Sequence, residues 1–433
     1  MRSALSTFVM IVTITALAIP SARILSASGT SMGDSSYVLV GGQNGTWFEN
    51  GQAPRLERIE LSNHSITSLA PVHSGGTVWG GGWNGSQWLV SGWWEDDGPN
   101  GSDPYIYLYD GRNQVLGGSL NQYDAESSWH GGDVFAASYN GREWLLSGLG
   151  SGVLPSFSSQ QRNHMSLSIF DGYDFTDLSS WVPRQRDAIL YTNAWNGKYW
   201  LVGGGYDENG ILFSFDGSKI VDLSDQIGPS VSNFGSIQAV AWNGYYWLVG
   251  GRSFLAAYDG YTFTDLTDKL DSVLRFNSGC CATVNAIAWN GAEWMIGGGA
   301  PIAQMSNSQA WLVTYSAQNF VDLTQEIRPP APDLIPPSSI LTITAAQYSW
   351  IIGGYLNNHG SLYEYSGKSF TNLSGLVSNY TYVTWVGAGT VQGNIQIAPT
   401  TYNPIFPESR MLTGQFIRQA PDTLQSIEVY RFD

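Results

Sequence analysis

Short apolar runs recur along the chain, and seven of them end in Gly-Gly or Ser-Gly. The recurrence has a period of about fifty residues, which is typical of supersecondary units that stack into one body. The paired positions are Gly41-Gly42, Ser91-Gly92, Ser147-Gly148, Gly203-Gly204, Gly250-Gly251, Gly297-Gly298 and Gly353-Gly354. No long stretch has the period of an amphipathic helix, so the pattern predicts many short strands.

The fifth copy shows the plan of one repeat most clearly. An apolar run over 237–242 is followed by Asn243-Gly244, a second apolar run and the glycine pair, and then by two runs separated by Asp259-Gly260. Asn-Gly and Asp-Gly between apolar runs favour tight hairpins, which we expect to be type I′ turns with positive φ at both central residues. Two hairpins make four antiparallel strands, which is one blade of a propeller.

The sequence therefore predicts an all-β fold, a seven-bladed β-propeller of four-stranded antiparallel blades over residues 37–388. The first copy lacks an innermost strand, whereas a spare apolar run stands at 382–386. We expect this C-terminal strand to pair with the first blade and close the ring. Residues 389–433 are expected to form a C-terminal extension that packs on the propeller, with the start of an eighth blade as the alternative.

The order of these features resembles the kelch repeat. The resemblance extends over about 37–387 and is carried by Gly250, Gly251, Tyr258, Asp259, Phe263 and Leu266, and by Gly203, Gly204, Phe215, Asp216 and Leu223. The chain departs from that repeat in having Gly after the Asp, where Pro is common, and in lacking Trp in the outer strand. Kelch-like propellers include both binding proteins and enzymes, so the resemblance implies the fold and leaves the function open.

The N-terminus and the charge balance indicate where the protein works. Met1-Arg2 is followed by an apolar run to Ile19 and then by small residues, the pattern of a secretory signal. We expect residues 1–28 to be a signal peptide or an uncleaved N-terminal anchor, which would be the protein's contact with a membrane, and the protein to be secreted or on the cell surface. Nineteen basic residues against 35 acidic ones exclude nucleic-acid binding, which needs clustered Lys and Arg.

Strand order divides the connections of a blade between two faces of the ring. Both hairpin turns lie on one face, the turn face. The loop after each glycine pair and the crossover to the next blade lie on the other, and we expect all of them to be long and variable, as is typical of binding surfaces. This second face is called the long-connection face below. The candidate binding residues there are Trp93, Trp94, Asp97, Trp129, Trp181, Arg184 and Asp207.

Other candidate chemistry is sparse. The adjacent Cys280 and Cys281 are either a vicinal disulfide, which an oxidising exterior would permit, or two thiols. Glycosylation sequons occur at Asn44, Asn63, Asn84, Asn100, Asn372 and Asn379. The five histidines show no paired spacing, and the acidic run 95–97 does not match a calcium loop, so we predict neither a metal site nor a cofactor. The copper of kelch-like oxidases is therefore not carried over.

These observations favour an exported, non-enzymatic propeller that binds a protein or glycan partner through its long-connection face. One alternative is an enzyme that cleaves glycans with two carboxylates at the mouth of the ring, for which Asp97, Asp187 and Asp207 are candidates. A quinone-dependent oxidoreductase is a further alternative, because some propellers of that class place a vicinal disulfide beside the cofactor. The chain lacks the docking repeats of that class.

Overall fold

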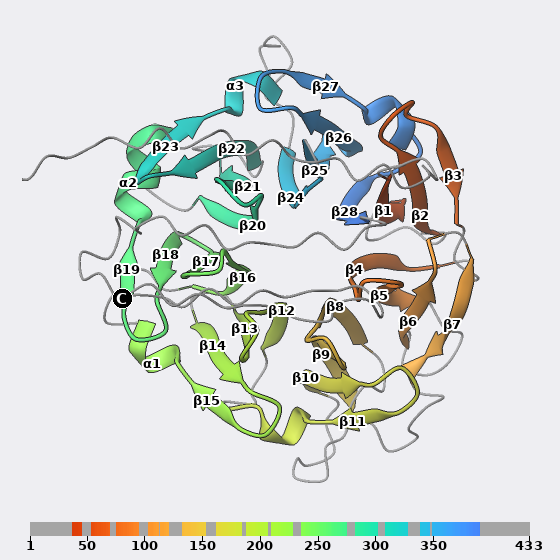
Figure 1. Cartoon of the computed structure of the whole chain (residues 1–433), viewed down its shortest axis with the longest axis vertical. Helices are drawn as coiled ribbons and strands as arrows, with labels where there is room; N and C mark the ends of the chain where they lie inside the picture. Colours follow the sequence, from red (N-terminus) through yellow and green to blue (C-terminus); the bar gives the residue numbers. More distant parts are fainter. Residues whose placement is uncertain are drawn as a thin grey trace, which may run out of the picture. The chain divides into compact units, whose positions relative to one another are not determined.

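The chain folds into a ring of seven four-stranded antiparallel sheets, so the predicted seven-bladed propeller is confirmed (Figure 1). The computed structural model describes residues 37–45, 53–69, 75–94, 103–111, 113–120, 132–152, 162–183, 188–206, 209–227, 235–274, 282–301, 308–327, 338–346 and 349–389. All of them belong to the unit Ser35–Asp433. The predicted signal or anchor at 1–28 lies outside the described residues, as does the predicted extension after Gly389.

Each blade runs from the ring axis outward, and the seven innermost strands together surround the axis (Figure 1). The first four blades are β28 (Tyr382–Gly389), β1 (Tyr37–Asn44), β2 (Ala53–Glu60) and β3 (Ile66–Ser68); β4 (Thr77–Trp83), β5 (Trp88–Trp94), β6 (Asp103–Tyr109) and β7 (Gln114–Ser119); β8 (Gly132–Tyr139), β9 (Trp144–Gly152), β10 (Arg162–Phe170) and β11 (Phe175–Asp177); and β12 (Ile189–Trp195), β13 (Trp200–Tyr206), β14 (Asn209–Phe215) and β15 (Ile220–Asp222).

The remaining three blades follow the same plan. They are β16 (Ile237–Trp242), β17 (Trp247–Gly251), β18 (Phe254–Tyr258) and β19 (Phe263–Asp265); β20 (Thr283–Trp289), β21 (Trp294–Pro301), β22 (Ser308–Ser316) and β23 (Asn319–Asp322); and β24 (Ser338–Ala345), β25 (Trp350–Leu356), β26 (His359–Tyr365) and β27 (Phe370–Asn372). Short helices follow five of the outer strands: η2 (Ser179–Trp181), α1 (Ser224–Ile227), α2 (Thr267–Leu274), α3 (Thr324–Ile327) and η3 (Ser374–Val377).

The ring closes as the spare C-terminal run predicts. Strand β28 pairs antiparallel with β1 from Tyr37 opposite Gly389 to Gln43 opposite Tyr382. The hydroxyl of Tyr380 donates a hydrogen bond to the carbonyl of Val40 at 3.2 Å, which ties the incoming crossover to the same strand. The two ends of the propeller are thus held in one sheet.

The first glycine of each pair allows the next blade to approach closely. A Cβ built on Gly250 would lie 2.5 Å from Cγ1 of Val284, on the innermost strand of the following blade. Gly41 meets Val78 in the same way, Gly203 meets Ile237, Gly297 meets Ile340 and Gly353 meets Val383. No side chain fits there, because two close-packed sheets already occupy the space. Ser147 stands at this position in blade three and accepts a hydrogen bond from Nδ2 of Asn193 at 2.7 Å.

The second glycine lies opposite a β-bulge in the innermost strand of its own blade. Gly250 pairs with Ala239 and Gly251 with Ile237, which leaves Gln238 without a partner on the second strand. A Cβ on Gly251 would collide with the carbonyl oxygen of Ser236. Each of the seven blades has its register shift at this same step. The pair therefore accommodates the adjacent blade with one glycine and the bulge with the other.

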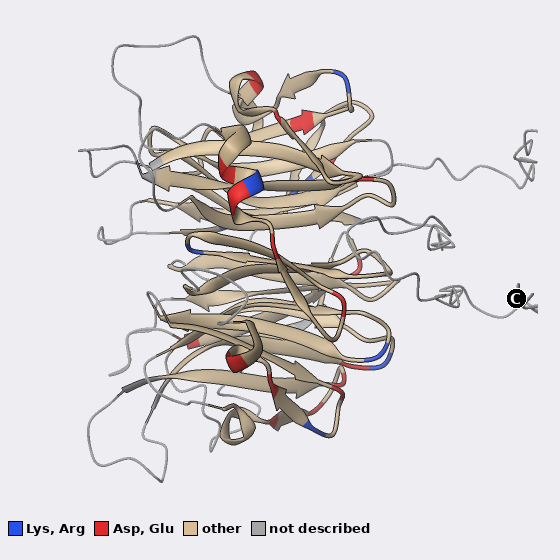
Figure 2. Cartoon of the chain, turned by 90° about the vertical axis from the view of Figure 1, so that its left-hand side faces the viewer, with Lys and Arg blue, Asp and Glu red and all other residues tan. Residues whose placement is uncertain are grey.

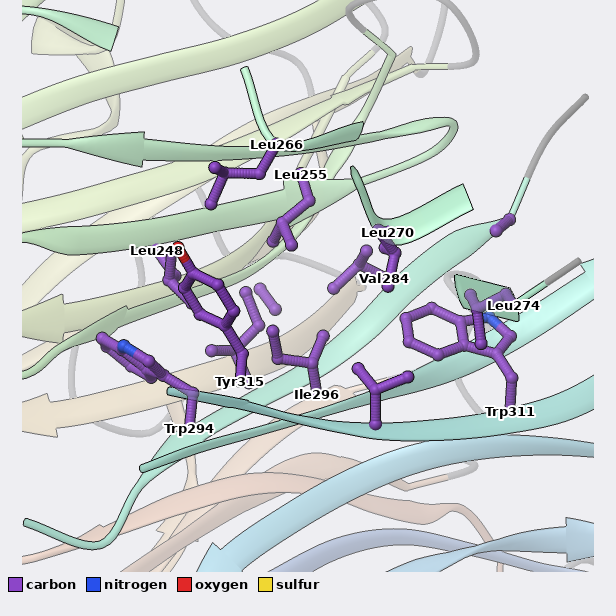
Figure 3. Close-up of a cluster of buried hydrophobic side chains, with 14 of the residues drawn as sticks. Leu248, Leu255, Leu266, Leu270, Leu274, Val284, Trp294, Ile296, Trp311 and Tyr315 are labelled. Atoms are coloured by element: carbon purple, nitrogen blue, oxygen red, sulfur yellow. The ribbon is translucent and has the colours of Figure 1, made fainter. Parts of the chain in front are cut away.

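The recurring tryptophans lie in the core, as their regular spacing predicts. Trp144, Trp200, Trp247 and Trp294 are among the largest fully buried side chains. Nε1 of Trp247 donates a hydrogen bond to the hydroxyl of Tyr199 in the preceding blade at 3.2 Å, and Trp294 donates to Tyr246 at 2.9 Å. Between blades five and six, Trp294 packs in one cluster with Trp311, Tyr315 and several leucines (Figure 3).

The hairpin turns differ from the predicted type I′ geometry. Trp242 pairs with Trp247, so four residues form the loop, and among Asn243 and Gly244 only Gly244 has positive φ, at 96°. Oδ1 of Asn243 instead accepts hydrogen bonds from the amides of Tyr245 and Tyr246 at 2.9 and 2.8 Å. Asp or Asn thus closes the loop through its side chain and leaves the left-handed conformation to Gly.

A motif at the outer rim, Asp or Asn followed by Leu and then Ser or Thr, was not predicted. Oδ1 of Asp222 accepts a hydrogen bond from the amide of Ser224 at 2.9 Å, and Oγ of Ser224 accepts one from the amide of Leu212 at 3.0 Å. Leu223 between them is buried. The same arrangement occurs at 177–179, 265–267, 322–324 and 372–374. It attaches the start of the crossover to the third strand.

The expectation that every connection on the long-connection face is long is wrong for three blades. Two residues join β13 to β14, β17 to β18, and β25 to β26. Asn357 and Asn358 make the last of these turns with φ of 53° and 60°, since Asn tolerates the left-handed region. The crossovers between blades and the other second-to-third connections remain longer. On the side of the molecule that Figure 2 shows, charged residues lie mainly at turns, helices and outer strands. Strand β2 carries four charged residues, Arg55, Glu57, Arg58 and Glu60.

Replacing Gly250 with alanine should lower the free energy of unfolding by about 1–3 kcal/mol, because its Cβ would overlap Val284. Gly375→Ala is the matched control, since nothing lies within 4 Å of a Cβ at that position. Urea denaturation at constant pH measures both. A Gly250→Ala midpoint equal to that of the wild-type protein would contradict the packing role of the glycine pair.

Candidate functional site

The bulges turn one residue per blade toward the ring axis. The bulged residues, in blade order, are Thr384, Trp79, Phe135, Tyr191, Gln238, Asn285 and Leu341. All are half-buried except Thr384, which is buried. The second strand covers one edge of an innermost strand and the neighbouring blades cover its two faces, so its exposed surface faces the axis or an end of the ring. This set is called the bulge ring below.

The bulge ring lies toward the long-connection face. Each innermost strand begins where the crossover enters and runs toward the turn face, and the bulge comes near its beginning. In β16, for example, Gln238 is the second residue of a strand that starts at Ile237. The seven side chains therefore share one level of the ring, close to the end at which the crossovers arrive.

Blades two to four contribute an arc of three aromatic side chains to the bulge ring. The ring centroids of Trp79 and Phe135 are 5.2 Å apart with planes inclined at 40°. Those of Phe135 and Tyr191 are 5.6 Å apart at 64°, an edge-to-face contact. These distances are in the range of favourable aromatic pairs. The three rings form one apolar surface across three consecutive blades, and each remains partly exposed.

Blades five and six contribute primary amides to the same level. Nε2 of Gln238 donates to the hydroxyl of Ser236 at 3.2 Å. Nδ2 of Asn285 donates to Oγ of Ser339 and to the carbonyl of Ile340, both at 2.9 Å. The amide of Asn285 thus links blade six to blade seven. The bulge ring is consequently apolar on one side of the axis and polar on the other.

Asp133 lies two residues before Phe135 on β8 and is the single ionisable carboxyl group on the innermost strands. The residue keeps some exposed surface, although its carboxyl group is enclosed by protein. Burial raises the pKa of this carboxyl to about 7, against the opposing effect of a hydrogen bond from the Trp79 side chain. A carboxyl group with this pKa exchanges its proton near neutrality, which makes it a functional candidate.

The paired tryptophans of blade two lie on a strand and not in a loop. Trp93 and Trp94 are the last residues of β5, opposite Pro104 and Asp103. Trp94 is buried, and its ring is stacked on that of Tyr105 at 5.5 Å between centroids. Trp93 is half-buried. Trp94 therefore contributes to the core at the long-connection face, whereas Trp93 retains exposed surface there.

Trp181 ends η2 and is 52% exposed. It lies at the outer rim, because η2 directly follows the outermost strand of blade three, so the structure does not bring it beside the bulge ring. Tyr206, at the end of β13, is 57% exposed at the long-connection face. The other candidates, Asp97, Trp129, Arg184, Asp207, Cys280 and Cys281, lie outside the described residues, as does Asp187.

The sequons fall into different environments. Asn44, Asn63, Asn372 and Asn379 are exposed, and Asn100 lies outside the described residues. Asn84 opens the first hairpin turn of blade two, where its Oδ1 accepts a hydrogen bond from the amide of Gln87 at 2.7 Å. Asn372 occupies the Asp position of the rim motif and accepts a hydrogen bond from the amide of Ser374 at 2.8 Å. Two of the six sequons therefore coincide with structural positions of the repeat.

Neither a metal cluster nor a membrane-spanning helix occurs in the described part of the chain. Within the ranges given above, no three His, Cys, Asp or Glu side chains gather as metal ligands would. Across the same ranges, no helix combines the length and the apolar character needed to cross a bilayer.

The bulge ring was missed because strand alternation alone does not reveal a bulge. The signal that could have found it is the alignment of the seven innermost strands on the residue that faces the first glycine, such as Val78 or Ile237. The following position varies from Trp to Gln, Asn, Leu and Thr, whereas its neighbours remain small or apolar. Variation at one position of an otherwise regular repeat marks a residue that is not required by packing.

Comparison with known proteins gives no family for the chain. No protein-family model matches the chain, and no curated protein matches it. The Pyrococcus horikoshii acylaminoacyl peptidase is 11% identical with a TM-score of 0.47, covering 79% of this chain and 51% of the peptidase. The β-propeller domain of the Trilobed protease from Pyrococcus furiosus is 11% identical with a TM-score of 0.45, covering 79% and 93%. A structure of a nidogen/laminin complex is 8% identical with a TM-score of 0.40, covering 82% and 99%.

The chain spans about half the length of the acylaminoacyl peptidases it matches. Likeness at this level carries no argument about this chain, and the propeller architecture rests on its own sheet topology.

Asp133→Asn should make the protein more stable at pH 8 and leave it nearly unchanged at pH 4. The folded-state pKa of Asp133 is about 7, above its ordinary value, so the free energy of unfolding falls as the pH rises from about 4 to 7. The loss in the free energy of unfolding over this pH range is at most about 4 kcal/mol, and asparagine, which does not ionise, removes this loss. Urea denaturation at pH 4, 6 and 8 measures the difference between the variant and the wild-type protein.

Asp171→Asn is the matched control for this measurement. Backbone hydrogen bonds lower the pKa of Asp171, so its contribution changes only below about pH 4, and its removal should leave the wild-type difference between pH 6 and 8 intact. If Asp133→Asn showed the same pH dependence as the wild-type protein, an enclosed carboxyl group at that position would be excluded.

Proposed function

We propose that the protein is an exported propeller that binds a partner, a protein or a glycan, at its long-connection face. The observation that carries this proposal is the aromatic arc of Trp79, Phe135 and Tyr191, which belongs to the bulge ring at that end of the ring. Partly exposed aromatic side chains on a rigid scaffold are typical anchors for ligands and partners, because they contribute contact area at small entropic cost.

Three further features support binding at blades two to four. Trp93 keeps exposed surface at the end of β5 in blade two, and Tyr206 is 57% exposed at the end of β13 in blade four. The sequence candidates Trp129, Arg184 and Asp207 belong to the connections of the same blades. A partner that contacted these residues together with the aromatic arc would rest on three adjacent blades.

A glycan-cleaving enzyme is the second candidate, favoured by Asp133. Burial raises the pKa of its carboxyl to about 7, so the group could act as a general acid near neutral pH. Glycosidic cleavage needs a second carboxylate across the bond, for which Asp97, Asp187 and Asp207 are the sequence candidates. Mass spectrometry of glycans incubated with the protein distinguishes the two proposals, because binding alone leaves their masses unchanged.

The binding proposal predicts that exposed aromatic residues contribute to partner affinity on the long-connection face and not on the turn face. Trp93→Ala and Tyr206→Ala should each weaken partner binding more than about tenfold, since loss of a buried aromatic anchor commonly costs 2 kcal/mol or more. The matched controls are Tyr173→Ala and Tyr261→Ala, because these side chains are 82% and 73% exposed in hairpin turns on the turn face.

The measurement is binding of the purified secreted protein to a glycan array and to an array of extracellular proteins. Equal losses from both faces, or losses from the turn-face variants alone, would contradict the proposal. If the wild-type protein bound to neither array, the proposal would also be contradicted.

A further inference from the structure

We infer that the bulge ring is a binding site for a neutral saccharide, held between the aromatic arc of blades two to four and the amides of blades five and six. This inference rests on the proposed binding function and names both the ligand class and the position at which the ligand sits. Each step below concerns side chains that the bulges turn toward the axis.

The innermost strands offer no charged donor to an anionic ligand. The seven strands that surround the axis contain no Lys, Arg or His. Phosphate, sulfate and carboxylate groups bind where guanidinium or ammonium groups offer charged donors, and none is present on these strands. The ligand that fits this surface carries no negative charge.

The aromatic arc fits the apolar face of a sugar ring. Its three rings meet at centroid distances of 5.2 and 5.6 Å and form a curved surface, not one flat stack. A pyranose presents axial C–H groups on one face, and burying that face against aromatic rings removes apolar area from water. Trp79 and Tyr191, at the two ends of the arc, each offer a partly exposed ring to such a face.

The polar side of the bulge ring complements the hydroxyl groups of a sugar. The NH₂ groups of Gln238 and Asn285 already donate to Ser236, Ser339 and the backbone. The side-chain oxygen of each amide is an acceptor that can receive a hydrogen bond from a hydroxyl group. Neutral polar groups opposite an apolar surface can fix the orientation of a bound sugar through hydrogen bonds alone. Small-ligand sites commonly combine apolar walls with a few such groups.

Aromatic rings beside a carboxyl group also characterise sites for organic cations. Two observations favour the saccharide. The carboxyl of Asp133 is enclosed and hydrogen-bonded to the Trp79 side chain, so it does not face the axis as a free anion. The amides of blades five and six would add nothing to the recognition of a quaternary ammonium group, which offers no hydrogen-bond donors.

The test is calorimetric titration of the full-length secreted protein at pH 6 with a panel of neutral oligosaccharides, and with tetramethylammonium as the organic cation. Trp79→Ala and Tyr191→Ala should weaken saccharide binding more than tenfold, and Gln238→Ala several-fold. Tyr191→Phe should retain binding, because the ring face is unchanged. Tyr261→Ala, an exposed aromatic side chain on the turn face, is the matched control and should bind within twofold of the wild-type protein.

The outcomes separate this inference from the proposed function. Saccharide binding that is lost in Tyr206→Ala but unchanged in Trp79→Ala and Tyr191→Ala would overturn the inference and leave the binding proposal standing. Tetramethylammonium binding in place of saccharide binding would overturn it in favour of a cation site. Binding to an extracellular protein without any saccharide would also overturn it, and a protein that bound nothing on either array would contradict the proposed function itself. Circular-dichroism melts confirm that each variant is folded.

Discussion

The close approach of neighbouring blades at the first glycine of each pair is the contact on which the rest of the structure depends. Val284 packs where a side chain on Gly250 would otherwise stand, and the equivalent contact recurs around the ring. This approach brings the innermost strands together around the axis. The second glycine then gives space to the bulge, since the carbonyl of Ser236 lies where a Cβ on Gly251 would be. The glycine pair therefore determines both the packing between blades and the direction of the side chains in the bulge ring.

The architecture could be predicted from the sequence because the same order of strands and turns recurs in each repeat. Seven Gly-Gly or Ser-Gly pairs, the hairpin signals between apolar runs and a spare strand at 382–386 were enough for the blade number and the closure. The turn geometry was wrong because Asn243 and Gly244 look the same in a two-residue turn as in a four-residue loop closed by a side chain. The rim motif was missed because its members, such as Asp222 and Ser224, are separated by a buried leucine and act through hydrogen bonds that no periodicity reveals.

The candidate site was harder to predict for a physical reason. A bulge shifts the register by one residue, so Phe135 and Tyr191 occupy positions that simple alternation does not turn toward the axis. The loop residues that attract attention in the sequence, such as Trp94, include side chains that complete the core. The bulge positions of the seven blades hold residues as different as Trp79 and Thr384. A propeller of this kind can change its ligand by substitution at one position per blade without disturbing the contacts between blades.

The pairing of β28 with β1 has a consequence for how the chain is made. Strands β1 to β3 are synthesised first, yet the inner edge of their sheet stays open until residues 382–389 have left the ribosome. Non-local pairing of this kind is slow to form, because the loss of loop entropy precedes the stabilising contacts. The first sheet therefore becomes complete only after the last strand of the propeller has been made.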